Sequence, residues 1–265
     1  MDVSGKVAVV TGAGGDGSGR AIARRLAREG ATLIVADVND AGSAETVGLI
    51  DADGGRAASV HTDVRREADV QALIARVEGD FGGLDILVNN ASGRQYPELT
   101  LDHWFTNLQV DLLGAMYGIR YGLESMRRRG GGAIVNIGSV SALCHGGRIS
   151  KAPGYDTAKA AVVRLTTALA ALGDDEGIRI NCLAPGWIAT PPIKAYWESL
   201  TPEQRAAQGV PPVLLRVEEI ADAVVRLVTD GRLAGRVLVW WNGQAPGLIP
   251  VGDPGYGGLE ELLIY

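Results

Sequence analysis

Short apolar runs alternate with longer amphipathic segments along most of this 265-residue chain. Strands that alternate with helices in this way favour a parallel, doubly wound sheet with helices on both faces. We therefore predict an α/β fold built on a seven-stranded parallel sheet. The seven strand-like runs are Val7 to Val10, Thr32 to Ala36, Ala57 to Val60, Ile86 to Val88, Ala133 to Ile137, Ile178 to Leu183 and Arg236 to Trp240.

Six segments between these runs have the apolar spacing of helices. No internal repeat, charge block or proline- and serine-rich linker divides the chain, so a single domain over residues 1–265 is expected. Residues 190–216 follow a strand on the side where such sheets bind ligands, and this position predicts a substrate lid. Residues 241–265 form a glycine- and proline-rich tail. The helical segments are Arg20 to Glu29, Ala41 to Asp53, Glu67 to Gly79, Leu101 to Arg128, Tyr155 to Leu172 and Val217 to Thr229.

Charge and composition exclude several classes of function. The formal net charge of −6 argues against nucleic acid as a partner, because a polyphosphate requires a basic patch. No apolar stretch approaches the roughly 18 residues of a membrane span, and the first strand begins too early for a signal peptide. We expect a soluble, cytoplasmic protein with no membrane partner. The two cysteines and three histidines lack metal-ligand spacing, so no metal site is expected.

A glycine-rich segment, Thr11 to Arg20, connects the first strand to a helix that begins near Ala21. Glycines permit a tight turn and let backbone N–H groups approach a pyrophosphate at the positive end of the helix. The segment therefore suggests a dinucleotide site of the Rossmann type.

The second strand ends in Asp37, about twenty residues beyond the loop, where a carboxylate can accept both ribose hydroxyls of an adenosine. Such a carboxylate repels a 2′-phosphate, so NAD is favoured over NADP. The alternative is that Asp37 only caps the following helix. Polar residues also end the third strand, at His61 to Val64, and the fourth, at Asn89 to Ala91, so one crevice should collect them all.

Tyr155 and Lys159 lie four residues apart and so share one helix face, where the ammonium can stabilise a phenolate and lower the pKa of the tyrosine from about 10. They follow a strand that ends in Asn136 to Ser139, and they precede Asn181 to Gly186. A phenolate within hydrogen-bond reach can take the hydroxyl proton of an alcohol while NAD takes the hydride.

This ordered series closely resembles the short-chain dehydrogenase/reductase family, classical type, from Gly5 to about Trp240. The resemblance implies hydride transfer between NAD(H) and a secondary alcohol or ketone. A weaker similarity at Trp104 to Val110, to the branch that includes 15-hydroxyprostaglandin dehydrogenase, favours a hydrophobic substrate. Family members form dimers or tetramers through the two long helices, so we expect a homodimer or homotetramer. The apolar end of the chain, Leu262 to Tyr265, either packs across the subunit boundary or is frayed.

The resemblance also implies roles for individual residues. Tyr155 is the catalytic acid/base, Lys159 lowers its pKa and holds the nicotinamide ribose, and Ser139 binds the substrate oxygen, with Ser141 as the alternative. Asp63 and Val64 flank the adenine. The implied cofactor-binding residues are Gly12, Asp16, Gly17, Ser18, Gly19, Asp37, Asp63, Val64, Asn90, Tyr155, Lys159, Pro185, Gly186 and Ile188.

Three departures from the family pattern stand out. The glycine-rich loop fits only if one residue is inserted within Gly14 to Asp16. Asp111 occupies a position where the family commonly has an asparagine that kinks a helix and anchors a water near the lysine. We keep Asp111 as a relay member, although its charge should alter the coupled titration. Finally, the loop Cys144 to Gly154 is three residues longer than usual and should border the substrate. His145 or Arg148 could bind a polar or acidic group there, but solvated loop residues are the favoured interpretation.

Two other functions stay open. A non-catalytic NAD-binding sensor would retain the cofactor crevice without turnover, and an NADP-dependent carbonyl reductase would reverse the cofactor preference that Asp37 indicates.

Overall fold

The structure is a computed structural model and describes residues 1–93, 100–143 and 152–252. The predicted substrate contacts His145 and Arg148, most of the loop that carries them, and the apolar end of the tail lie outside the described residues.

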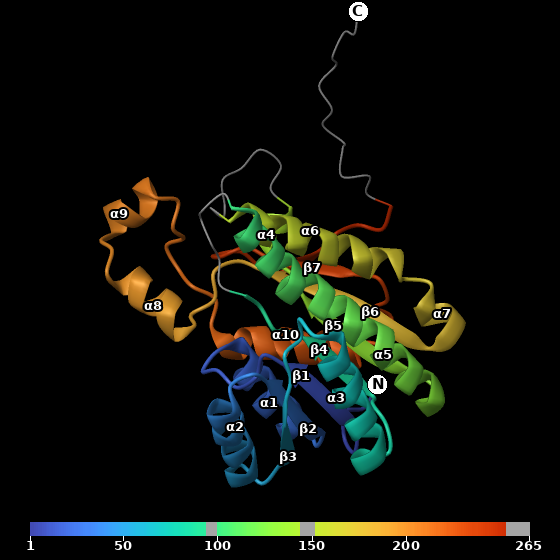
Figure 1. Ribbon diagram of the computed structural model, residues 1–265. Coiled ribbons are helices and arrows are strands. Elements are labelled where there is room, and N and C mark those ends of the chain that lie inside the picture. The colour runs from blue at the N-terminus through green and yellow to red at the C-terminus, as the bar shows by residue number, and fades with distance from the viewer. Residues whose placement is uncertain (94–99, 144–151, 253–265) are drawn as a thin grey trace, which may run out of the picture.

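One sheet runs through the whole molecule in the order β3-β2-β1-β4-β5-β6-β7-β8 (Figure 1). The pairs from β3 to β7 are all parallel, and β8 pairs antiparallel with β7. The predicted α/β class and doubly wound order are confirmed. The strands are β1 (Val7–Thr11), β2 (Thr32–Asp37), β3 (Arg56–His61), β4 (Ile86–Asn89), β5 (Gly132–Ile137), β6 (Ile178–Pro185), β7 (Val237–Trp240) and β8 (Gly247–Leu248).

The prediction of seven strands was wrong by one, because β8 adds a short antiparallel edge from the tail. Its two residues are exposed and have no apolar alternation that the sequence could show. Backbone pairing holds this segment, including a bond from the Ile249 N–H to the Val237 carbonyl at 3.0 Å, and the Arg236 guanidinium adds a bond to the Ile249 carbonyl at 3.0 Å.

Two layers of helices cover the sheet, and successive residues of β1 face them alternately. Ala8 and Val10 pack with α1, α2 and α10, whereas Val7 and Val9 pack on the side of α3 and α5. The described helices of these layers are α1 (Ser18–Arg28), α2 (Asp40–Ala52), α3 (Glu67–Phe81), α4 (Leu101–Asn107), α5 (Gly114–Arg129), α6 (Pro153–Ala168), α7 (Leu172–Glu176) and α10 (Val217–Thr229).

Two predicted helices are divided in the structure. The segment predicted from Leu101 to Arg128 contains a π-helical turn, η1 (Leu108–Leu113), between α4 and α5. Such wide turns often occur at functional sites, and this one carries Asp111 into the interior, where it is 3% exposed. The segment predicted to end at Leu172 stops at Ala168, and α7 follows as a separate short helix.

The predicted lid contains two short helices, α8 (Pro191–Glu198) and α9 (Pro202–Ala207), which stand apart from the sheet in Figure 1. A backbone bridge between Ile188 and Leu215 closes the base of this excursion. Aromatic contacts brace it: Trp187 stacks on Tyr196 with ring centroids 6.2 Å apart, and the Arg205 guanidinium lies 3.4 Å from the ring centroid of Trp197.

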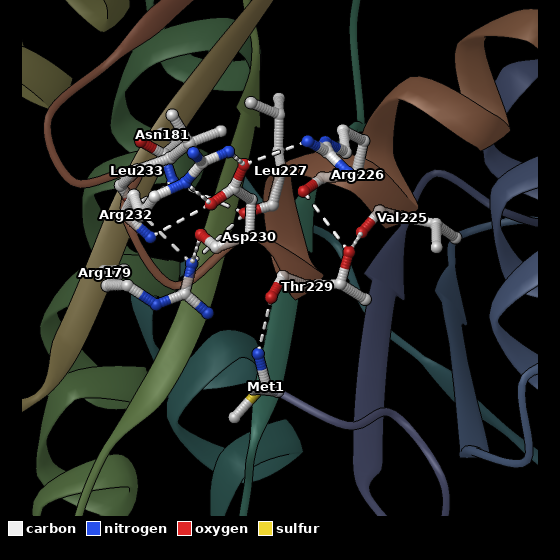
Figure 2. Close-up of polar contacts among 10 residues, drawn as sticks. All are labelled: Met1, Arg179, Asn181, Val225, Arg226, Leu227, Thr229, Asp230, Arg232 and Leu233. Carbon is white, nitrogen blue, oxygen red and sulfur yellow. Dashed lines mark hydrogen bonds and ion pairs between the residues drawn. The ribbon is translucent and has the colours of Figure 1, made fainter.

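The carboxyl end of α10 is fixed by two cationic groups from distant parts of the chain (Figure 2). Arg179 donates to the carbonyl oxygens of Val228 at 2.6 Å and Asp230 at 2.9 Å, and the Met1 ammonium donates to that of Thr229 at 2.6 Å. Positive charge is favourable at a helix carboxyl end, where the last carbonyls lack helical partners. These contacts tie α10 to β6 and hold the segment that leads into β7.

No helix within the described ranges combines the length and the apolar character needed to cross a membrane.

Candidate active site

The glycine-rich loop folds tightly against the start of α1. Gly12 has a positive φ of 69°, and its N–H donates to the Ala36 carbonyl at 2.8 Å. A Cβ built on Gly19 would lie 2.2 Å from the Gly12 oxygen, so only glycine permits this approach. The N-cap residue Gly17 makes no side-chain cap bond, which leaves the positive end of α1 open to an anion.

Two of the three positions predicted to contain the extra residue lie at the exposed tip of the loop. Gly15 and Asp16 are both exposed, and nothing lies within 4 Å of a Cβ built on Gly15. The Gly17 N–H donates to the Gly15 carbonyl at 3.0 Å, which closes a small turn at this point. Asp16 points back toward Arg20, with 3.9 Å between their charged atoms.

Asp37 joins the loop to the end of β2. Its Oδ2 accepts from the Gly14 N–H at 2.8 Å and its Oδ1 from the Asn39 N–H at 2.9 Å. The cap of α2 is Asn39, whose side chain accepts from Gly42 at 3.1 Å, so capping that helix is not the role of Asp37. A carboxylate has about four acceptor positions, which leaves Asp37 able to accept from sugar hydroxyls.

Asn90 fastens the other side of the loop. Its amide donates to the carbonyls of Thr11 at 2.9 Å and Gly12 at 3.1 Å, and it accepts from the Ser18 hydroxyl at 2.9 Å. The Thr11 hydroxyl in turn accepts from the N–H groups of Asn90 and Ala91, both at 3.1 Å. Sequence reasoning assigned Asn90 to the cofactor but missed Thr11, whose partners are about 80 residues away.

Asp63 and Val64 lie just beyond β3. The Arg65 guanidinium is 2.6 Å from the Asp63 carboxylate and holds its pKa below the usual range. Val64 is buried and packs so closely on the start of α5 that a Cβ at Gly114 would come within 2.9 Å of it.

A crevice of about 320 Å³ opens at the carboxyl ends of the strands, and it collects most of the remaining predicted residues. The crevice connects the predicted cofactor-binding residues with the predicted catalytic residues, because both the cofactor loop and α6 contribute to its wall. The predicted residues that line it are Ser18, Asn90, Ser139, Tyr155, Lys159, Pro185, Gly186 and Ile188, with Ser141 beside them.

Lys159 lies at the buried end of this crevice. Its Nζ donates to the Ile137 carbonyl at 2.9 Å, lies 3.1 Å from Asp111 Oδ1, and is 5.5 Å from the centroid of the Tyr155 ring. Burial is the largest single influence and lowers the pKa of Lys159, but the interactions with Asp111 and Tyr155 act in the opposite direction, and the pKa is raised overall.

The pKa of Tyr155 is also raised. Loss of contact with water is the largest cause. Lys159 and a hydrogen bond with Ser139 act in the opposite direction, as the spacing of the two residues predicts, but Asp111 adds to the effect of burial. The shared helix face therefore brings Lys159 close enough to act on Tyr155, while the net direction differs from the one expected.

Ser139 is buried at the end of β5, and its Oγ accepts from the Ser141 N–H at 3.1 Å. The Ser141 hydroxyl is buried in the same wall and has no hydrogen-bond partner within the described ranges. Both serines thus face the crevice, so either one is placed where a residue that binds the substrate oxygen would have to lie.

Several residues in or behind the crevice were not assigned to it from the sequence. Trp187 and Ile193 line it from the start of the lid. Asn242 lies behind it, accepting from the Trp187 N–H and donating to the Trp187 carbonyl, both at 2.8 Å. The only sequence signal for Asn242 is its place directly after the seventh strand.

Thiol and metal chemistry have little support here. Burial raises the pKa of Cys182 to about 12, so its thiol stays protonated. Among the described residues, no three His, Cys, Asp or Glu side chains are grouped so as to hold a metal ion.

A bound dinucleotide fits these features. The missing Cβ atoms at Gly12 and Gly19, the open end of α1 and the acceptor at Asp37 form a cradle that leads into the crevice beside Tyr155. Comparison of the sequence with family models gives a match to "short chain dehydrogenase" over residues 6–200. The chain belongs to the short-chain dehydrogenase family.

Relatives of known name agree with this assignment. The chain is 38% identical to cis-4-hydroxycyclohexanecarboxylate dehydrogenase from Sinomonas cyclohexanicum, over 85% of this chain and 90% of the relative. It is 34% identical to cyclohexanol dehydrogenase from an Acinetobacter species, over 85% and 88% of the two chains. A solved structure from Burkholderia xenovorans, assigned to the short-chain dehydrogenases/reductases, matches with a TM-score of 0.81 and 32% identity, over 90% of this chain and 96% of the other.

The predicted resemblance is therefore confirmed. This short-chain dehydrogenase is an oxidoreductase of the class that acts on CH–OH donors, in a family that binds a nicotinamide cofactor and includes dehydrogenases of cyclic alcohols.

We predict that Gly19→Ala weakens NAD binding by about tenfold or more, since its Cβ would displace the Gly12 carbonyl. The added atom should also lower the free energy of unfolding by about 1–3 kcal/mol, as overpacking does. Gly15→Ala is the matched control, because space is open there and its φ is not positive. Titration calorimetry and denaturant unfolding measure both quantities. Equal NAD affinity in the two variants would contradict the described loop packing.

Proposed function

We propose that this short-chain dehydrogenase transfers hydride between NAD(H) and a hydrophobic cyclic secondary alcohol or its ketone, with Tyr155 as the acid/base. The observation that carries the proposal is the shared crevice, where Ser139, Tyr155 and Lys159 line the same space as Asn90 and Pro185 of the cofactor side.

The substrate class is supported by the wall of the crevice and by the relatives. Val140, Trp187 and Ile193 contribute apolar surface, and the volume of about 320 Å³ is at the lower end of small-ligand sites. The names of two relatives specify six-membered carbocyclic alcohols. A compact alicyclic ring presents apolar faces to such walls while its single hydroxyl can reach the serines and Tyr155.

The preference for NAD rests on Asp37. Its carboxylate faces the glycine-rich loop and is already fixed by two backbone N–H groups. A 2′-phosphate placed there would meet a like charge, whereas ribose hydroxyls would find an acceptor. The alternative of an NADP-dependent carbonyl reductase requires a compensating cation near Asp37.

The proposed mechanism assigns each step to a side chain of the protein. When bound, the nicotinamide accepts or supplies the hydride. Tyr155 exchanges the proton with the substrate oxygen, and Ser139 orients that oxygen by a hydrogen bond. Lys159, fixed by the Ile137 carbonyl, supplies the positive charge that stabilises the phenolate form. Pro185 and Gly186, held through the Asn242 and Trp187 contacts, shape the cofactor side of the crevice.

We also propose a homodimer or homotetramer. Leu101, Phe105 and Met116 are exposed along the run from α4 to α5. An apolar row of this kind on one helical segment supports association with a second copy.

Tyr155→Phe removes the proton-exchanging hydroxyl and leaves the ring in place. We expect kcat/KM for cyclohexanol oxidation to fall by about 10²- to 10⁴-fold, with little change in NAD affinity. Absorbance of NADH and calorimetric binding measure the two effects. If no alcohol or ketone reacts with the wild type although NAD binds tightly, the sensor alternative would replace the proposed enzyme.

Asp37→Ala should lower the ratio of NAD to NADP affinity by about tenfold, because one repulsive charge is removed and two hydroxyl acceptors are lost. Binding of both cofactors to the wild type and the variant measures the ratio. Asp51→Ala is the control, since Asp51 is an exposed charge of the same sign on α2 and is not among the predicted cofactor-binding residues. A wild type that binds NADP more tightly would reverse the assignment of Asp37.

A further inference from the structure

Besides Tyr155, Lys159 has a second buried neighbour, the carboxylate of Asp111. Its Nζ lies 3.1 Å from Asp111 Oδ1, and the two side chains are only 3% and 0% exposed. An asparagine, which the family commonly has here, would leave the ammonium charge of Lys159 uncompensated. With aspartate the pair is neutral overall. The negative charge of Asp111 therefore offsets much of the electrostatic stabilisation that Lys159 would give to a Tyr155 phenolate.

Three further groups donate hydrogen bonds to the Asp111 carboxylate. Ser92 donates its hydroxyl to Oδ1 at 2.5 Å, and the Gly93 N–H donates to Oδ2 at 3.3 Å. The Asn107 amide also donates to Oδ2, at 3.5 Å. The π-helical turn η1 places Asp111 where these groups and Lys159 meet.

The other ionisable groups around the pair do not cancel its effect. The Cys182 thiol, on β6, faces Lys159 and stays protonated because burial raises its pKa to about 12. Asp156, next to Tyr155 on α6, adds a weaker negative influence on the phenol than Asp111 does. Lys159 is the cation that favours the phenolate, and Asp111 is paired directly with it.

We propose that Asp111, as a positioning residue paired with Lys159, keeps Tyr155 in its phenol form at neutral pH. Tyr155 is thereby prepared to donate its proton to a ketone as hydride reaches the carbonyl carbon, after which the phenolate regains a proton from water. Alcohol oxidation, which needs the phenolate at the start, requires alkaline pH. This inference rests on the proposed function for its consequence, although the protonation state itself is independent of any substrate.

The experiment is a pH titration of the full-length protein labelled with ¹³C at the tyrosine Cζ, followed by NMR without cofactor. Tyr155→Phe identifies the resonance. We expect wild-type Tyr155 to titrate above the ordinary value of about 10. Asp111→Asn should lower the midpoint by about one to three pH units, the range of a close charge interaction.

Two further variants distinguish the direct pairing of Asp111 with Lys159 from the effect of any nearby negative charge on Tyr155. Asp156→Asn removes a neighbouring charge that does not pair with Lys159, so its shift should be less than half as large. Ser92→Ala keeps the Asp111 charge, so its midpoint should stay closer to that of the wild type than to that of Asp111→Asn.

A wild-type midpoint well below about 10 would overturn the proposal even if Asp111→Asn failed to fold. An unchanged midpoint in Asp111→Asn, or equal shifts in both aspartate variants, would also overturn it. In turnover assays, the acidic limb of the oxidation profile should shift by the same amount as the midpoint. Expected NMR shifts without any turnover would sink the proposed function but not the role of Asp111.

Discussion

Parallel pairing of β1 through β7 is the constraint on which the rest of the molecule depends. It brings the carboxyl ends of all these strands to one edge, so residues that lie far apart in sequence meet there. Gly12, Asp37, Asn90, Ser139 and Pro185 each follow or end a different strand of this set. A one-residue register error in any pair would exchange the residues that face the two helix layers and also displace a polar residue of the crevice.

A buried polar layer then joins the strands to α6, the helix that carries the proposed catalytic residues. Asn89 of β4 donates to the Asn136 side chain of β5 at 2.8 Å, and Asn136 donates to the Thr166 hydroxyl of α6 at 2.9 Å. Buried amides are costly unless paired, so these bonds specify one position of α6 against the sheet. Since Tyr155 and Lys159 lie on the same helix, the layer also fixes their place in the crevice.

Most of the sheet could be predicted from the sequence because a buried parallel strand is a continuous apolar run. The observed bounds of β1 and β7 differ from the predicted ones by a single residue at one end. The eighth strand and the π-helical turn at Asp111 could not be predicted in this way, since backbone pairing and long-range packing determine them. The same reason hides Ser92 and Asn242, whose importance comes from contacts with Asp111 and Trp187 rather than from any local pattern.

Transfer of deuterium tests the central claim of hydride transfer most directly. Cyclohexanol deuterated at the carbinol carbon would be incubated with the protein and NAD at alkaline pH, and the recovered dinucleotide examined by mass spectrometry. The account predicts that one deuterium per turnover moves to the nicotinamide ring and that cyclohexanone accumulates in equal amount. Formation of ketone without label in the dinucleotide, or tight NAD binding with no transfer from any cyclic alcohol, would contradict it.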